Sequence, residues 1–347
     1  MMRFGLGIPT CREGLAYPSG FADLQMTARL AQVAERVGFD ALWANDHLAT
    51  QRVILDELPA PPNFYEPVVT FAYLASQAPR LVFMLATVVA PLREPVLLAK
   101  QIATLDQASG GRVILGLGIG AYREELEAVN REAARINRGR IMEETVTALR
   151  LLFTRRRAQF SGTYLGFAEI EVFPKPVQTP LPIYLSGNSP QAIRRAAALA
   201  DGWILAAASP ERTAAAVSQL RTHAVAAGRD PAEIEVCLQT WVSIGATAED
   251  AVDRLRASQH FRRLRALHPS DDLNALTHSF AENNLLGTSE QINDQLAAYE
   301  RAGVDHLGLV FLANTADDLM QQVELFGKQV LLGRPGVSVM ELQGEQA

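Results

Sequence analysis

Residues 81–118 read LVFMLATVVAPLREPVLLAKQIATLDQASGGRVILGLG. The first part, Leu81 to Val89, is apolar on both faces and rich in β-branched residues, which is typical of a strand buried in a parallel sheet. Pro95 to Leu105 fits a helix, the Gly110–Gly111 pair breaks the chain behind it, and Val113 to Gly118 again has strand character. The stretch therefore predicts one strand–helix–strand unit.

The same alternation continues on both sides of this unit. Segments with strand character lie at 3–9, 41–45, 81–89, 113–118, 183–186, 203–207, 234–244 and 306–312. Helical stretches separate them, and this order favours a parallel sheet. No segment resembles an interdomain linker and no short repeat occurs, so we predict a closed (β/α)8 TIM barrel rather than an open, doubly wound sheet.

Two segments depart from this alternation. Gln159 to Phe173, after the fourth strand, has the pattern of a hairpin, and Thr247 to Phe280, after the seventh, is too long for a simple connection. We therefore expect insertions after strands 4 and 7. Residues 1–332 would form a single domain, and residues 333–347 a flexible tail.

Composition and charge restrict the class of protein. Hydrophobic residues make up 48% of the 347 residues and charged residues 20%, which is enough for a large core. The net charge of −6 provides no basic field for nucleic acid, and no apolar stretch reaches the length of a membrane span. The N-terminus has the pattern of a strand rather than a signal peptide, and Cys11 and Cys237 indicate no disulfide framework. We therefore expect a cytoplasmic protein that binds neither nucleic acid nor membranes.

The end of the fifth strand suggests an anion site, because catalytic groups in such barrels gather at the C-terminal ends of strands. The strand ends in Ser186, Gly187, Asn188 and Ser189, and Pro190 then begins a helix. Small residues at a helix start expose backbone N–H groups that bind anions. Ser189 acting only as a helix cap would explain the same residues, but beside the other polar strand ends a phosphate site is the better interpretation.

The end of the second strand carries Asp46 and His47. An imidazole is suited to proton transfer near neutral pH, and Asp46 is in a position to orient it. A pair that braces a loop explains the same residues equally well. The other histidines in helices and insertions, His260 among them, are expected on the surface. Neither the histidines nor the carboxylates have the spacing of a metal site, so no metal is expected.

Several fragments, taken in order, resemble the luciferase-like superfamily, which includes FMN-dependent monooxygenases and F420-dependent dehydrogenases and reductases. The similarity runs from Phe4 to about Gly327. Its most specific fragments are GFDALW at 38–43, PLREPVLLAK at 91–100, SGGR at 109–112 and PKPVQ at 174–178. The first leads to the Asp46–His47 pair and the last to the Ser186–Ser189 turn, and the order and spacing of the fragments support the assignment.

The resemblance implies a role for each strand end. The Ser186–Ser189 turn would bind the flavin phosphate, and His47 would donate or accept a proton. The residues that would back or approach the flavin ring are Thr87, Val88, Val89, Gly118 and Gly120. The family often has a non-proline cis peptide at this wall, which would be Val88–Val89 here. By their location, Tyr122 and Tyr164 would line the substrate side.

The resemblance leaves three functions open. The first is a monooxygenase that takes reduced FMN from a separate flavin reductase and acts with O2 on a small organic substrate. The second is hydride transfer with F420, and the third is a non-catalytic flavin-binding barrel, which the Asp46–His47 pair disfavours. Ala121 and Gln51 stand where F420-dependent glucose-6-phosphate dehydrogenases have an acid and a tryptophan, which argues against sugar-phosphate oxidation. The family also implies a homodimer.

Overall fold

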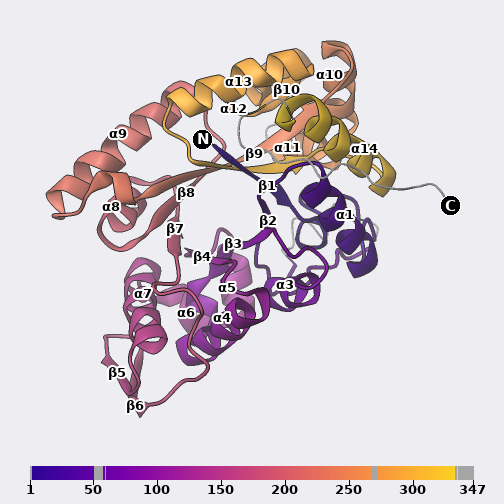
Figure 1. Ribbon diagram of the computed structural model, residues 1–347. Coiled ribbons are helices and arrows are strands. Elements are labelled where there is room, and N and C mark those ends of the chain that lie inside the picture. The colour runs from indigo at the N-terminus through magenta and orange to yellow at the C-terminus, as the bar shows by residue number, and fades with distance from the viewer. Residues whose placement is uncertain (1, 51–57, 59, 268–271, 333, 335–347) are drawn as a thin grey trace.

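The computed structural model describes residues 2–50, 58, 60–267, 272–332 and 334 of the chain. Its strands form a ring in which each pairs in parallel with the next and the last pairs with the first. In ring order they are β1 (Arg3–Gly7), β2 (Ala41–Ala44), β3 (Val82–Val89), β4 (Val113–Gly118), β7 (Ile183–Ser186), β8 (Gly202–Ala206), β9 (Glu235–Ile244) and β11 (His306–Phe311). The predicted (β/α)8 barrel is confirmed, and every predicted strand lies within two residues of its observed bounds (Figure 1).

Helices cover the outside of the ring (Figure 1). They are α1 (Leu24–Arg36), α3 (Pro67–Leu74), α4 (Pro95–Ser109), α7 (Arg138–Thr154), α8 (Pro190–Leu199), α9 (Pro210–Ala226), α13 (Ser289–Arg301) and α14 (Ala316–Phe326). Helix α4 shows how the local sequence sets these bounds. The Glu94 side chain accepts the N–H groups of Val96 and Leu97, and Gly110 ends the helix in the left-handed region at φ 71°. Glycine adopts that conformation at no steric cost, so the predicted break is confirmed.

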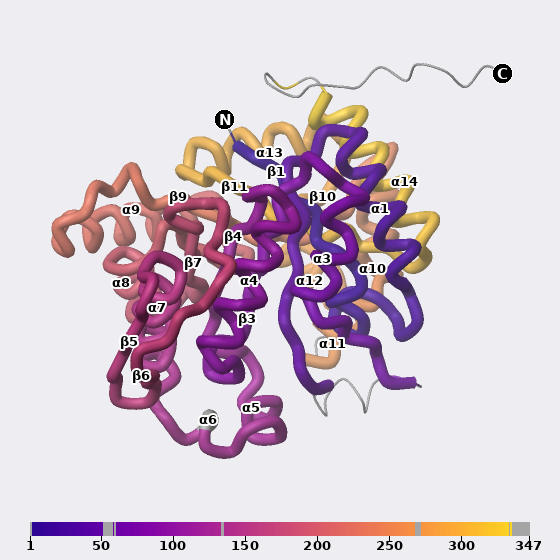
Figure 2. The backbone as a smooth tube through the Cα atoms, turned by 60° about the horizontal axis from the view of Figure 1, so that its bottom comes forward, coloured from indigo at the N-terminus to yellow at the C-terminus, as the bar shows by residue number. Residues whose placement is uncertain are grey.

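Insertions follow β4 and β9, as predicted. After β4 the chain forms α5 (Arg123–Val129), α6 (Arg131–Arg135) and, beyond α7, an antiparallel hairpin of β5 (Ala158–Ser161) and β6 (Gly166–Ile170). After β9 it forms α10 (Ala248–Ala257), α11 (Gln259–Leu267), α12 (Leu273–Asn283) and β10 (Leu285–Gly287). β10 pairs in parallel with β9 outside the ring, which no pattern indicated because a three-residue strand shows no period. Figure 2 shows α5, α6 and α11 toward the end of the barrel opposite the N-terminus.

The predicted tail at 333–347 lies outside the described residues apart from Arg334. That arginine contacts Glu300, with Nη1 3.0 Å from Oε1, and its guanidinium lies 5.2 Å from the centroid of the Phe4 ring. Across the described ranges, no helix combines the length and the apolar character needed to cross a bilayer.

A tryptophan fills the centre of the barrel. Trp43 on β2 is fully buried, and glycines of β1 and β11 lie against its ring. A Cβ on Gly5 would lie 2.0 Å from Trp43 Nε1, and one on Gly308 would lie 2.3 Å from its Cε3. The ring therefore encloses a packed core, like other barrels of this size, and any ligand has to bind above it at the mouth.

A polar cluster lies at the opposite, N-terminal end of the barrel. Glu235 accepts a hydrogen bond from the Tyr184 hydroxyl, forms an ion pair with Arg3, and lies 3.3 Å from Nε2 of His306. Burial alone would raise the pKa of Glu235, but the nearby His306, the hydrogen bond from Tyr184 and the charge of Arg3 lower it to about 2. Polar groups at this end of a barrel serve stability rather than catalysis.

Replacing Glu235 with glutamine is expected to lower the free energy of unfolding at neutral pH and to flatten its decline in acid. A carboxylate whose folded pKa lies below its usual value of 4.5 stabilises the fold above that value, and the stabilisation is lost as the pH falls toward about 2. Urea unfolding at a series of acidic pH values measures this dependence. Glu233→Gln, at an exposed position two residues away, is the matched control and should leave the profile unchanged. A Glu235→Gln profile parallel to that of the unmodified protein would contradict the assignment.

Candidate active site

A cavity of about 550 Å³ opens at the C-terminal ends of β2, β3, β4 and β7. This volume lies within the range of cofactor pockets. Most of the predicted site residues line it, namely Asp46, His47, Thr87, Val89, Gly118, Gly120, Ser186, Gly187, Asn188 and Ser189. Closure of the ring therefore brings these separate strand ends to one surface. Within the described ranges, no group of histidine, cysteine and carboxylate side chains is arranged to hold a metal ion.

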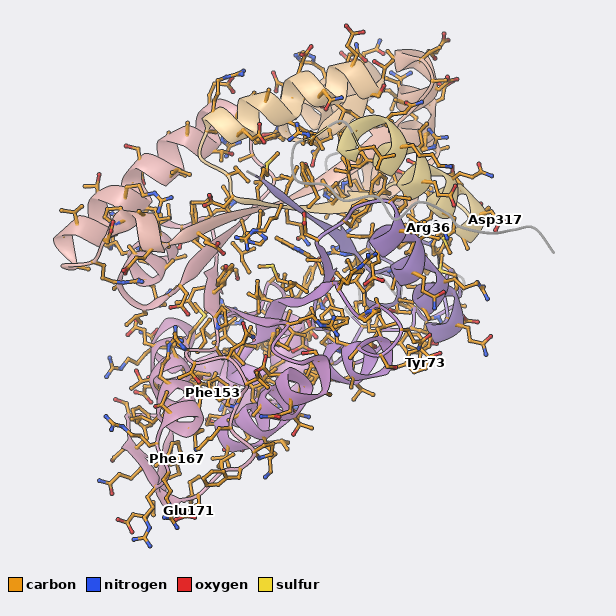
Figure 3. The ribbon with its side chains drawn as sticks, viewed as in Figure 1. Arg36, Tyr73, Phe153, Phe167, Glu171 and Asp317 are labelled. Atoms are coloured by element: carbon orange, nitrogen blue, oxygen red, sulfur yellow. The ribbon has the colours of Figure 1, made fainter. Side chains whose placement is uncertain are left out.

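The other predicted residues lie outside this lining. Val88 is buried behind the wall, because successive residues of a strand point to opposite faces. Tyr122 lies beside His47, with ring centroids 5.9 Å apart. Tyr164 lies on the β5–β6 hairpin and is 40% exposed, and Figure 3 shows Phe167 of the same hairpin near the outer edge of the molecule. Tyr164 is therefore not among the residues that line the cavity, and its placement on the substrate side stays a prediction.

The Ser186–Ser189 turn forms one end of the cavity. The Ser189 hydroxyl caps α8 by accepting the N–H of Ala192, so its role as a helix cap is confirmed. A Cβ on Gly187, which has φ 131°, would lie 2.8 Å from Ala192 Cβ. Arg195, one turn further along α8, also lines the cavity, although nothing in the helical spacing distinguished it. Arg195 Nε is paired with Glu143 at 3.1 Å, and the helix start together with the rest of this guanidinium suits an anionic group at this end of the cavity.

His47 is held by a carboxylate from the insertion after β4. Its Nδ1 lies 3.1 Å from Oε2 of Glu125, and both side chains are buried. The other oxygen of Glu125 accepts the N–H groups of Leu48 and Ala49. Burial alone would raise the pKa of Glu125, but the hydrogen bonds from His47 and from the two backbone amides lower it. Glu125 is therefore an ionised acceptor that orients the imidazole.

Asp46 braces the wall of the cavity instead of orienting His47. Its carboxylate accepts Nε of Arg93 and the N–H of Val89, each at 3.1 Å. The predicted contact is wrong because consecutive residues after the strand direct their side chains to different neighbours. The orienting carboxylate, Glu125, lies on a short helix with other acidic residues, and no signal in the sequence singled it out.

The β3 wall contains the non-proline cis peptide, but at Ala86–Thr87 rather than at the predicted Val88–Val89. The register between β3 and β4 shifts between Leu85 and Val88, and pairing is regular again from Val88 onward. The cis peptide therefore lies within this irregular stretch, two residues before the predicted Val88–Val89 bond. A Cβ on Gly118 would lie 2.4 Å from Thr87 Oγ1, so β4 can approach this wall only with glycine at that position.

His260 is not a surface residue, contrary to expectation. Its ring stacks on Trp241 with centroids 3.7 Å apart. Burial, together with the charge of Arg263, lowers its pKa to about 3, so the imidazole is neutral at neutral pH. The position of α11 over the mouth explains the difference, because α11 buries one of its own faces against β9 and the loop after β1.

The family model for luciferase-like monooxygenases matches residues 2–306. The chain belongs to this family of oxidoreductases, as its sequence fragments indicated. It is 27% identical over 333 residues to the FMNH2-dependent dimethylsulfone monooxygenase of Pseudomonas putida, and the alignment covers 89% of this chain and 87% of that protein. It is 29% identical over 222 residues to the F420-dependent hydroxymycolic acid dehydrogenase of Mycobacterium tuberculosis, which covers 62% of this chain and 58% of that protein.

Solved structures share the fold at low sequence identity. An F420-dependent secondary alcohol dehydrogenase in complex with an F420–acetone adduct superposes with a TM-score of 0.78 at 20% identity, over 96% of this chain and 99% of that chain. The oxygenating constituent of 3,6-diketocamphane monooxygenase from Pseudomonas putida, in complex with FMN, gives a TM-score of 0.75 at 20% identity, over 98% and 99%. At this level of identity the likeness concerns the barrel alone.

Proposed function

We propose that this protein is an FMN-dependent monooxygenase that oxygenates a small organic substrate, with reduced FMN supplied by a separate flavin reductase. The observation that carries the proposal is one cavity lined by the Ser186–Ser189 turn, by Thr87 and Val89 of β3, and by His47, whose Nδ1 is held by Glu125. The aligned length of the dimethylsulfone monooxygenase, which covers most of both chains, supports FMN over F420.

The residues present fit a flavin nucleotide. The Ser186–Ser189 turn and Arg195 would hold the phosphate, and Thr87 and Val89 would back the ring. Gly118 leaves the wall open where any side chain would meet Thr87. When bound, reduced FMN would supply the two electrons that allow one oxygen atom of O2 to enter the substrate while the other leaves as water.

The chain's own contribution to the chemistry is the placement of a proton. Glu125 is an acceptor for two backbone N–H groups, so the proton between it and His47 belongs on Nδ1. This tautomer leaves Nε2 as the nitrogen that takes up or releases a proton at the cavity. The carboxylate also stabilises the imidazolium that forms when Nε2 is protonated. A flavin store has no need of such a pair, which favours an enzyme.

F420-dependent hydride transfer is the second candidate. F420-dependent dehydrogenases are among the curated relatives, including one for glucose 6-phosphate from Nakamurella multipartita that is 28% identical over 253 residues. The same His47–Glu125 pair could take the proton of an alcohol during such a reaction. The cytoplasmic location and the homodimer stay predictions under both candidates.

Replacing Arg195 with methionine is expected to weaken FMN binding about tenfold, because a charge-assisted contact to the phosphate is lost. The adjacent, exposed Arg194 provides the matched control, and Arg194→Met should bind FMN normally. Riboflavin lacks the phosphate, so both variants should have the same affinity for riboflavin as the unmodified protein. Fluorescence quenching of each flavin measures these affinities. Equal loss of FMN and riboflavin affinity would contradict a phosphate contact.

Cofactor choice is decided by the same titration made with F420, followed by oxygen uptake with reduced FMN and a flavin reductase. FMN binding with substrate-dependent oxygen uptake supports the monooxygenase. F420 binding without oxygen uptake supports the second candidate instead. Binding of neither cofactor at tens of micromolar would contradict both candidates.

A further inference from the structure

Arg12 is a buried arginine that has no counter-ion among the described residues. The residue is only 4% exposed. Within the described part of the chain, neither Nε nor Nη2 of its side chain has a hydrogen-bond partner. Burial lowers its pKa to about 10, which leaves the guanidinium charged at neutral pH. Tyr17 and Cys11 act on it electrostatically, but burial raises the pKa of both well above neutrality, so neither supplies a negative charge. A buried charge of this kind is costly unless a ligand pairs with it.

The neighbouring carboxylate does not serve Arg12. Glu13 turns away and accepts the backbone N–H groups of Gly20, Ala22 and Asn63. By contrast, the arginine at the edge of the cavity, Arg93, pairs with carboxylates on two sides. The lack of a partner is therefore a property of the Arg12 site and not of buried arginines in this protein generally.

Arg12 lies at the mouth of the barrel, across from the Ser186–Ser189 turn. A Cβ on Gly7, at the end of β1, would lie 3.2 Å from Arg12 Nε and 3.2 Å from the carbonyl oxygen of Leu309 on β11. Gly7 points to the same side of β1 as Gly5, which faces Trp43 inside the barrel. In the ring, β1 stands opposite β7, so the phosphate end of the cavity and Arg12 are on opposite sides of the mouth.

A second buried arginine stands over the same side of the mouth. Arg263 on α11 is 8% exposed, its Nη1 has no partner among the described residues, and its Nη2 donates to the hydroxyl of Tyr122 at 2.9 Å. Its helix contacts the loop that carries Arg12, because the His260 ring is hydrogen-bonded to the backbone of Leu15. Tyr122 in turn lies beside His47. Arg263 is therefore linked to His47 through Tyr122, and its helix contacts the loop that carries Arg12.

The unpaired atoms of Arg12 define the ligand. Nε and Nη2 form one edge of the guanidinium, and their N–H groups point in parallel, which matches two oxygens of one carboxylate or sulfonate group. A neutral substrate would leave this edge unpaired in a dry site.

We propose that the substrate of this protein is a small organic anion whose carboxylate or sulfonate group is bound bidentately by Arg12, on the side of the mouth formed by β1 and β11. The inference rests on the proposed function, since it names the substrate class; Arg12 lies on the β1 side of the mouth, outside the residues that line the cavity of about 550 Å³. The two anionic groups would then bind at opposite sides of the mouth. The cofactor phosphate would lie at the end of β7, and the substrate anion would lie at the end of β1.

Calorimetric binding tests the proposal without turnover. The probes are butanoate, methanesulfonate and the neutral dimethyl sulfone, each added to the FMN-loaded and to the cofactor-free protein. We expect at least one anion to bind more tightly than dimethyl sulfone, and Arg12→Met to weaken that anion by about 10- to 100-fold. Arg12→Lys keeps the charge but not the two parallel N–H groups, so its affinity for the anion should lie between those of the unmodified protein and Arg12→Met. Arg29→Met, at an exposed position on α1, is the control and should bind like the unmodified protein.

Stability gives a second readout. If Arg12 awaits a ligand, Arg12→Met removes an uncompensated charge, so its urea midpoint should equal or exceed that of the unmodified protein. A lower midpoint, or failure of Arg12→Met to fold, would show a structural arginine and overturn the proposal. Anion affinity equal in Arg12→Met and the unmodified protein, or tighter binding of dimethyl sulfone than of both anions, would also overturn it. An FMN titration of each variant, made alongside, distinguishes failure of the anion site from failure of the cofactor site.

Discussion

Replacing His47 with alanine is expected to lower turnover by about 10²–10⁴-fold while leaving the fold intact, because that is the usual contribution of a positioned acid–base group. His47 lines the cavity, and Glu125 fixes its Nδ1 side. The measurements are steady-state turnover with a saturating cofactor and the urea midpoint of the variant. His278→Ala, at an exposed histidine on α12, is the matched control and should keep full activity.

Rescue separates a proton-transfer role from a packing role. Imidazole added to His47→Ala should restore part of the lost turnover, since it can occupy the space and exchange the proton. Glu125→Gln keeps the shape of the side chain but removes the charge that holds Nδ1–H, and we expect a smaller loss of turnover that imidazole does not restore. Unchanged turnover in His47→Ala would make the residue structural.

The barrel was predictable from the sequence because its signals are local. β3 and β4 are short apolar runs, and glycines such as Gly110 end the helices between them. Each strand could therefore be found from its own residues. The residues at the strand ends followed, because a closed parallel ring has one mouth to which all those ends contribute.

The contacts of the site were not predictable because they depend on segments distant in sequence. His47 meets a carboxylate 78 residues away, on a short helix inside an insertion. The Asp46 side chain instead turns to β3, 43 residues away at Val89. Adjacency in sequence suggested the pair Asp46–His47, but the paths of the insertions decide which carboxylate reaches the imidazole. Arg12 carried no signal at all, since an arginine after a strand resembles any solvated one.

Replacing Asp46 with alanine is expected to reduce the free energy of unfolding by about 3–5 kcal/mol, which is the usual loss when one partner of a buried ion pair is removed. The Asp46 carboxylate is fully buried, and it is bound by Arg93 and by the N–H of Val89. Its loss would leave the guanidinium with Glu66, which lies 3.1 Å away and is 29% exposed, as its remaining acidic partner in the described part of the chain. Urea unfolding measures the change, and Asp253→Ala, at an exposed site on α10, is the control.

A double-mutant cycle distinguishes a brace from a catalytic acid at this position. If Asp46 acts by pairing with Arg93, then Asp46→Ala combined with Arg93→Met should be more stable than the sum of the two single changes predicts, because no buried charge is left unpaired. Asp46→Asn keeps an acceptor for the Val89 N–H and should lose less than Asp46→Ala. Normal stability with lost turnover in Asp46→Ala would contradict the brace and return the residue to the chemistry. The hydrogen bonds of Asp46 favour a structural role. Its carboxylate oxygens already accept the N–H of Val89 at the end of β3 and Nε–H of Arg93 in the chain that follows.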